Sequence, residues 1–480
     1  MSFELGIEGL ELASRLEASY SDIRIGDVYD RGIQVQNGSV STAQTIRTGG
    51  FGVRVLVDGA WGFAGSTDLT SDEVKVITEK AIKIAKASKR VRKHNVELLP
   101  SKPNKGSYET PMKTDPFNVD THDIIEVLMK AERTISDQSP LIKSSSAFFR
   151  AYKDKKLLLT SEGAEIEQEI TWCGGRMGCI ALRSGETQPM HYPDRRGRYC
   201  TSGYEHFESL DFPGEAERIG KEAVALLDAD KLTEHKTDLI LRHDLLMIQV
   251  HESCGHPTEL DRVLGTEADS AGTSFVTPDK LGKFMYGSEA MNLVADSTDL
   301  EGMGGFGYDD DGIPAKKTHL IKDGKFVNYQ SSRETAAEFG LEESSGGSRA
   351  KFAFNLPLVR MTNINLIPSG WKWEEIIEDT KKGVLMTQTK SNSIDDLRLS
   401  FLFGAEMGWE IKNGSKEKML KNCIYTGITP EFWRSLDAVS RDDWLMHGSA
   451  QCGKGMPSQE MPCGHRVSTA RFRDVRVWSE

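Results

Sequence analysis

Alternating apolar and polar residues dominate the chain from residue 22 to residue 64. The alternation is interrupted at Asn37-Gly38 and at Asp58-Gly59. Both dipeptides favour the tight turns of β-hairpins, because their residues tolerate positive φ. The pattern therefore predicts an antiparallel meander. Further strands are expected at residues 144–152, 157–160 and 166–172, after a loop at 100–117.

A second periodicity, one apolar residue every three or four positions, predicts helices in the same half. Thr70 and Ser71 precede one such stretch and are suitable N-terminal caps. The expected helices are residues 4–19, 71–88, 123–136 and 213–227. An antiparallel sheet with helices packed on it is an α+β arrangement.

After the polar stretch 228–237 the apolar runs are short and mostly typical of strands. One helix is expected at residues 430–437, and residues 446–470 are expected to form a loop. The expected strands are residues 238–241, 292–295, 317–322, 325–329, 358–366, 384–389, 401–411 and 417–425, and a last one ending at Trp478. We therefore predict an α+β protein of two domains, residues 1–230 and residues 231–480, the second of them β-rich.

Charge and composition argue against several classes of function. The formal net charge is −12 and acidic and basic residues are interspersed, which argues against a nucleic-acid partner. No apolar run is long enough to span a bilayer, and Met1-Ser2-Phe3-Glu4 does not begin a signal peptide. The seven cysteines have no disulfide-framework spacing. A cytoplasmic protein without membrane contacts is expected.

The stretch His251-Glu252-Ser253-Cys254-Gly255-His256 carries the clearest chemistry. Imidazoles bind zinc, and a neighbouring carboxylate can accept a proton from an activated water. Asp244 is expected to cap a helix, and the apolar run from Leu245 to Val250 predicts that the motif ends this buried helix, which Pro257 terminates. The two histidines are five positions apart, which places them about 140° apart around an ideal helix. We therefore expect a π-bulge, with Gly255 easing the distortion.

A catalytic zinc site normally takes three protein ligands and a water, so a third ligand is needed. Cys452 lies among small residues at 448–455, where we expect Lys454 to help keep its thiol deprotonated. From the residues alone the candidates remain open: Cys452, Cys463, His465, His447 and Cys254.

The stretch Gly302–Gly307 matches a dinucleotide-binding fingerprint only formally. Asp309, Asp310 and Asp311 follow it, and they do not begin a helix or have the spacing of an EF-hand. We therefore expect a solvated or substrate-lining loop here.

Taken in order, these motifs resemble the TldD/PmbA metallopeptidases, and the TldD-like subunit in particular. The resemblance covers residues 31–66, the His251–His256 motif, residues 309–325, Arg333-Glu334-Thr335-Ala336 and Cys452-Gly453-Lys454. It implies zinc held by His251, His256 and Cys452, with Glu252 as the catalytic base. It also implies cleavage of small unfolded peptides or peptide precursors, and a homodimer or a heterodimer with a PmbA-like paralogue, with the active site reached through a narrow passage. Cys463-Gly464-His465 departs from the family pattern, which leaves Cys463 as a rival ligand.

Two alternatives remain. A dipeptidyl-peptidase family has the same histidine spacing but needs a Glu-Glu-x-x-x-Glu segment, which residues 374–379 match only in part. The other alternative is a non-catalytic regulatory or binding subunit whose zinc is structural, in which four protein ligands would close the site.

Overall fold

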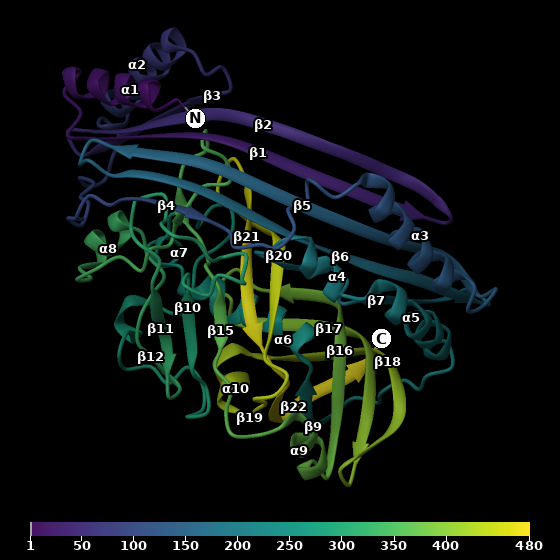
Figure 1. Ribbon diagram of the computed structural model, residues 1–480. Coiled ribbons are helices and arrows are strands. Elements are labelled where there is room, and N and C mark those ends of the chain that lie inside the picture. The colour runs from purple at the N-terminus through teal and green to yellow at the C-terminus, as the bar shows by residue number, and fades with distance from the viewer. Residues whose placement is uncertain (1) are drawn as a thin grey trace.

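A long, mostly antiparallel sheet forms the first part of the molecule (Figure 1). The computed structural model describes residues 2–480, and the strand order in this sheet is β3-β2-β1-β5-β6-β4, with β7 and β8 also paired to β6. Only β4 runs parallel to its neighbour β6. The strands are β1 (Tyr20–Gln36), β2 (Ser39–Val57), β3 (Ala60–Ser66), β4 (Lys105–Glu109), β5 (Ile142–Thr160), β6 (Glu165–Arg183), β7 (Glu186–Tyr192) and β8 (Arg198–Cys200).

The predicted hairpin turns are confirmed. Asn37 and Gly38 have φ values of 49° and 75° and join β1 to β2, and Asp58 and Gly59 likewise join β2 to β3. Positive φ at both central residues is the type I′ geometry whose twist matches that of paired strands.

Helices cover the sheet near its two ends (Figure 1). α1 (Phe3–Arg15) and α2 (Ser71–Ser88) pack around one apolar core, and α3 (Thr121–Ser136), α4 (Tyr204–Ser209) and α5 (Phe212–Leu226) around another. The Thr70 hydroxyl caps α2 by accepting a hydrogen bond from the Glu73 N–H at 3.3 Å. The predicted α+β class is confirmed.

Two further sheets build the second part. The larger has the order β18-β17-β16-β9-β22-β19, with β9 and β16 parallel, and the smaller has the order β12-β11-β10-β15. Helices α7 (Leu260–Val263), α8 (Arg333–Phe339), α9 (Trp373–Asp379) and α10 (Thr429–Arg434) are short. The strands are β9 (His235–Leu241), β10 (Leu293–Asp296), β11 (Lys317–Lys322), β12 (Lys325–Phe326), β15 (Ile364–Leu366), β16 (Lys382–Ile394), β17 (Ser400–Lys412), β18 (Ser415–Ile428), β19 (Leu436–Val439) and β22 (Ala470–Ser479), with a separate short pair, β13 (Ser348–Arg349) and β14 (Leu358–Val359).

Helix α6 (His243–Val250) lies in the core of this second part. It continues directly into a π-helical turn, His251–Gly255, and a 3₁₀ turn, His256–Thr258. The predicted π-bulge is therefore confirmed. A Cβ atom at Gly255 would lie 2.1 Å from the Met361 sulfur, so the absence of a side chain permits close packing here. The φ of Gly255 is −63°, an ordinary helical value, so the turn does not need the backbone freedom of glycine that the sequence suggested.

The expectation that Asp244 caps α6 is wrong. Arg242 occupies the cap position and makes no side-chain cap bond. The Asp244 carboxylate instead accepts hydrogen bonds from the Thr387 hydroxyl at 2.6 Å and the Gln388 N–H at 3.1 Å. It therefore ties the helix to β16.

The expected loop at residues 446–470 is also wrong. β20 (Leu445–Lys454) and β21 (Gln459–Val467) form an antiparallel hairpin, drawn in yellow between the first sheet and α6 (Figure 1). A Cβ atom at Gly448 would lie 2.1 Å from the Tyr199 carbonyl oxygen. The small residues that indicated a loop thus permit close packing of a strand.

Two further differences have physical causes. β5 continues through residues 154–156, where a break was predicted, because Lys155 and Lys156 pair with Glu169 and Asp310. Strand β4 lies inside the stretch expected to be a loop and is mostly exposed, so it has no apolar pattern to reveal it. We retain the division near residue 230, between α5 and β9, as a proposal. Among the described residues no helix is both long and apolar enough to cross a membrane.

Candidate metal centre

Three of the predicted site residues meet in the core. His251 and His256 come from the π-helical turn and its end, and Cys452 comes from β20. One ligand atom from each lies within 4.8 Å of the others, and all three side chains are buried. The Cys452 Sγ lies 3.6 Å from the His256 Nε2. The extra residue in the motif is accommodated by the wider turn, which brings the two imidazole centroids to 4.8 Å.

A second, overlapping donor set shares His251. It adds Cys463 and His465, which lie on β21 opposite β20. The His251 Nδ1 lies 2.8 Å from the His465 Nε2 and 3.7 Å from the Cys463 Sγ. His447 and Cys254 belong to neither set, because His447 pairs with His243 at 2.9 Å and the Cys254 thiol faces the Ser253 hydroxyl.

The two thiols of the hairpin are chemically different. A hydrogen bond from Cys463 holds the pKa of Cys452 well below that of an ordinary thiol. The same contact raises the pKa of the Cys463 thiol well above its ordinary value. The directions of the two shifts favour Cys452 as the thiolate of the pair. A thiolate rather than a thiol is the metal ligand.

Glu259 contacts the ring nitrogen of His256 that points away from Cys452. Its Oε2 lies 2.8 Å from the His256 Nδ1, which leaves Nε2 free on the side of Cys452. Burial lowers the pKa of His256, but the charges of Cys452 and Glu259 outweigh it and raise that pKa to about 9. Sequence reasoning missed Glu259, although a carboxylate three residues after a ligand histidine is a readable signal.

Lys454 does not have its expected role beside the thiol. Its ammonium group is buried 2.7 Å from the Asp261 carboxylate and 3.3 Å from the Glu259 Oε1. It therefore neutralises the carboxylate that orients His256, and Arg360 is the principal cation acting on Cys452.

Glu252 lies beside the cluster on the π-helical turn and remains slightly exposed. The Arg398 Nη1 donates to one of its oxygens at 2.8 Å, and the Asn392 Nδ2 donates to the other at 3.2 Å. Both partners come from the β16–β17 hairpin, which is far from Glu252 in the sequence, so no local sequence pattern predicts them. They fix the direction of the carboxylate.

The acidic loop at 309–311 is not solvated, contrary to one of the two expectations. Asp311 pairs with Arg54 at 2.8 Å, and Asp310 accepts hydrogen bonds from Lys156 and from the Ala350 N–H at 2.6 Å. All three aspartates are buried. The loop thereby joins the first sheet to the second part of the molecule.

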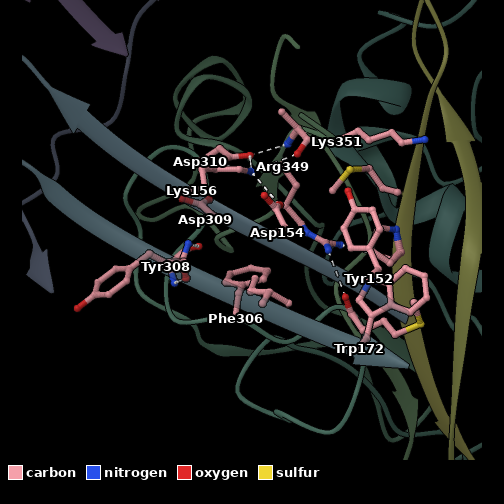
Figure 2. A pocket seen from close by; sticks show the side chains of 16 residues that line it. Tyr152, Asp154, Lys156, Trp172, Phe306, Tyr308, Asp309, Asp310, Arg349 and Lys351 are labelled. Carbon is pink, nitrogen blue, oxygen red and sulfur yellow. Dashed lines mark hydrogen bonds and ion pairs between the residues drawn. The ribbon is translucent and has the colours of Figure 1, made fainter. Parts of the chain in front are cut away.

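Asp309 and Asp310 also line a pocket against β5 and β6 (Figure 2). Tyr152, Asp154 and Lys156 alternate along β5 and form one wall. Burial raises the pKa of Asp154 to about 6. Figure 2 shows Arg349 between this wall and β21, where its guanidinium donates to the Pro462 carbonyl oxygen at 2.8 Å, one residue before Cys463.

Comparison with known proteins covers almost the whole chain. Models of the PmbA/TldA metallopeptidase family match in three segments: domain 1 at residues 21–85, the central domain at 114–227 and the C-terminal domain at 234–474. The last match contains every residue of both donor sets.

Individual relatives are also similar to this chain over nearly their full length. The chain is 31% identical over 445 residues to a metalloprotease of Methanocaldococcus jannaschii, covering 93% of this chain and 94% of that protein. It is 23% identical to a zinc metalloprotease TldD homolog of Saccharolobus solfataricus, covering 92% and 93% of the two chains. The crystal structure of TldE from Thermococcus kodakarensis has a TM-score of 0.73 at 17% identity and covers 98% of each chain. At that identity the likeness shows the fold.

Proposed function

Because the chain belongs to the PmbA/TldD metallopeptidase family, we propose that it is a zinc-dependent peptidase that hydrolyses small unfolded peptides or peptide precursors. One observation carries the proposal: the buried cluster of His251, His256 and Cys452 beside Glu252. Two imidazoles and a thiolate are donors that zinc prefers, and three protein ligands leave one position for water or substrate.

The dimensions of the cluster fit the ion. Zinc–nitrogen and zinc–sulfur bonds of about 2.0 and 2.3 Å in a tetrahedron separate a nitrogen from a sulfur ligand by about 3.6 Å. The separation of His256 Nε2 and Cys452 Sγ is 3.6 Å. Glu259 supports the same assignment, since a carboxylate on the far nitrogen of a ligand histidine is the usual outer partner at zinc.

In this proposal Glu252 is the general base. A zinc ion bound at this site supplies a Lewis acid for the scissile carbonyl and acidifies water. The Glu252 carboxylate accepts the proton of the attacking water and returns it to the leaving amine. Arg398 and Asn392 hold the carboxylate in one orientation, and the apolar packing around α6 limits access of bulk water.

An extended substrate could bind through backbone hydrogen bonds to an open strand edge, which gives affinity with little sequence preference. For assembly, we propose a homodimer or a heterodimer with a PmbA-like paralogue. The likeness of the fold to TldE supports the second arrangement, because two chains of one fold can form a pseudo-symmetric pair.

A second candidate function is a non-catalytic subunit with a structural zinc. One observation favours it: Cys463 and His465 lie close enough to His251 to complete a closed site. The raised pKa of the Cys463 thiol argues against this arrangement, and Glu252 would have no role in it.

The Glu252→Gln variant separates the two functions. The amide keeps the size of the side chain and one of its two acceptor oxygens, but it cannot accept the proton. We expect full zinc content and loss of peptide cleavage, measured by mass spectrometry of a defined peptide mixture with and without chelator. Chelator-sensitive cleavage by the variant would remove Glu252 from the mechanism, and absence of cleavage by the zinc-loaded wild type would favour the structural role.

A further inference from the structure

A strongly basic groove lies beside Glu252. Its volume is about 610 Å³, and its walls come from β6, the segment after β7, β16 and the β20–β21 hairpin. It is lined by Arg176, Arg195, Arg196, Thr389, Lys390, Ser391, Asn392, Gln451 and Glu460. Four of these residues are cations and one is an acid, whereas the chain as a whole has a net charge of −12. The local charge is therefore opposite to that of the protein.

The arginines of the groove are not neutralised by the protein. Among residues 2–480, Arg176, Arg195 and Arg196 make no ion pair with a carboxylate. Arg176 donates to the Arg195 carbonyl oxygen at 3.0 Å, and Arg195 donates to the Lys390 carbonyl oxygen. These bonds hold the side chains in place but leave their charge uncompensated. A guanidinium group without an anionic partner is suited to an external carboxylate, which it can bind with two parallel hydrogen bonds.

The groove is connected to the candidate catalytic centre by two routes. Arg196 donates to the Asn392 Oδ1 at 2.8 Å, and the Asn392 amide donates to Glu252 at 3.2 Å. On the other wall, Gln451 immediately precedes Cys452 on β20. The groove is therefore one hydrogen-bonded residue away from Glu252 and one residue along β20 from Cys452.

We propose that this groove binds a carboxylate of the peptide substrate and so determines which peptides are cut. The inference rests on the proposed peptidase function. The carboxylate is either the C-terminus of the peptide, which would place cleavage near that end, or an acidic side chain close to the cut bond. Because the groove is open to solvent and built from long side chains, its attraction for an anion falls as salt rises.

Binding of four labelled peptides to the zinc-loaded Glu252→Gln protein, which is expected to keep zinc without cleaving them, tests the proposal by fluorescence polarisation, a readout that does not need hydrolysis. The peptides share one length and sequence and differ only in a central Glu or Gln and a free or amidated C-terminus. We expect the carboxylate-bearing peptides to bind at least about tenfold more tightly than the neutral one, since ion-paired hydrogen bonds are the strong ones. Preference for the free C-terminus or for Glu identifies the source of the carboxylate.

The variants Arg176→Gln and Arg195→Gln are expected to abolish the preference, with KM rising and kcat little changed for peptides that are cut. Arg90→Gln is the matched control, because Arg90 is an exposed arginine after α2, outside the groove. Equal binding of all four peptides, or an unchanged preference in both groove variants, overturns the proposal. Chelator-sensitive cleavage would persist in that case, so failure of the groove proposal would not overturn the peptidase assignment.

Discussion

The Glu259 carboxylate lies 2.8 Å from the Nδ1 of His256 and is itself held by the buried ammonium group of Lys454 at 3.3 Å. The Glu259 carboxylate, held by Lys454, fixes which nitrogen of the His256 imidazole faces Cys452. The arrangement of the candidate ligands at the end of α6 is therefore determined by residues outside the donor set as well as by the donors.

Glu259→Gln is expected to weaken zinc binding by about 10–100-fold, because the amide is a poorer acceptor and loses its charge–charge contact with His256. Competition with a chromophoric chelator measures the affinity. Glu234→Gln, at an exposed carboxylate outside the cluster, is the control and should bind as the wild type does. Equal affinity in both variants would mean that Glu259 does not orient His256.

Cys452→Ser and Cys463→Ser are a matched pair on one hairpin. We expect the first to lose most of its zinc and the second to retain about one ion per chain, since the Cys463 thiol lowers the pKa of Cys452 and Cys452 is the ligand that we propose. Elemental analysis of the purified proteins decides between them. The reverse ranking would exchange the roles of the two thiols.

Gly255→Ala is expected to disturb the π-helical turn. The new methyl group would meet the Met361 sulfur at 2.1 Å, so the methionine must move within a packed core. Such overpacking costs about 1–3 kcal/mol. Lower zinc content and a lower Tm are expected, with partial recovery in the Gly255→Ala/Met361→Ala double variant.

Gly370→Ala is the matched control, because a Cβ atom there meets nothing within 4 Å. If Gly255→Ala had the zinc content and Tm of this control, the close approach to Met361 would not constrain the turn.

Asp154→Asn tests the half-buried carboxylate of the pocket in Figure 2. Burial raises its folded-state pKa to about 6, above the unfolded value of about 3.9, so ionisation destabilises the fold increasingly as pH rises between these values. The asparagine variant should gain stability, on the order of 1–3 kcal/mol, above pH 6 and little at pH 4.

Thermal unfolding of wild type and Asp154→Asn at pH 4 and pH 7.5 measures the difference. Asp310→Asn is the control and should be destabilised at pH 7.5, because it breaks the buried pair with Lys156. A Tm difference between Asp154→Asn and wild type that does not change with pH would contradict the raised pKa.

Local signals predicted much of this fold. The π-helical turn followed from one extra residue between His251 and His256, and the β1–β2 hairpin followed from Asn37-Gly38. The β20–β21 hairpin was not predictable, because the small residues that allow Gly448 to approach Tyr199 are also typical of loops.

The candidate site could likewise be predicted from the sequence only in part. The His-Glu-x-x-x-His spacing indicated two donors and the base, but the residue pattern could not rank Cys452 against Cys463. Their difference arises from one contact across a hairpin with an irregular register. Asn392 and Arg398 reach Glu252 from about 140 residues away, and only the tertiary fold brings them there.

X-ray absorption at the zinc edge of the purified protein tests the central claim most directly, because it counts sulfur and nitrogen or oxygen neighbours of the ion. We predict one sulfur at about 2.3 Å, and two imidazoles and one further light atom at about 2.0 Å, unchanged in Cys463→Ser. Two sulfur neighbours, or an active protein without zinc, would contradict a three-ligand site with a position open for the reaction.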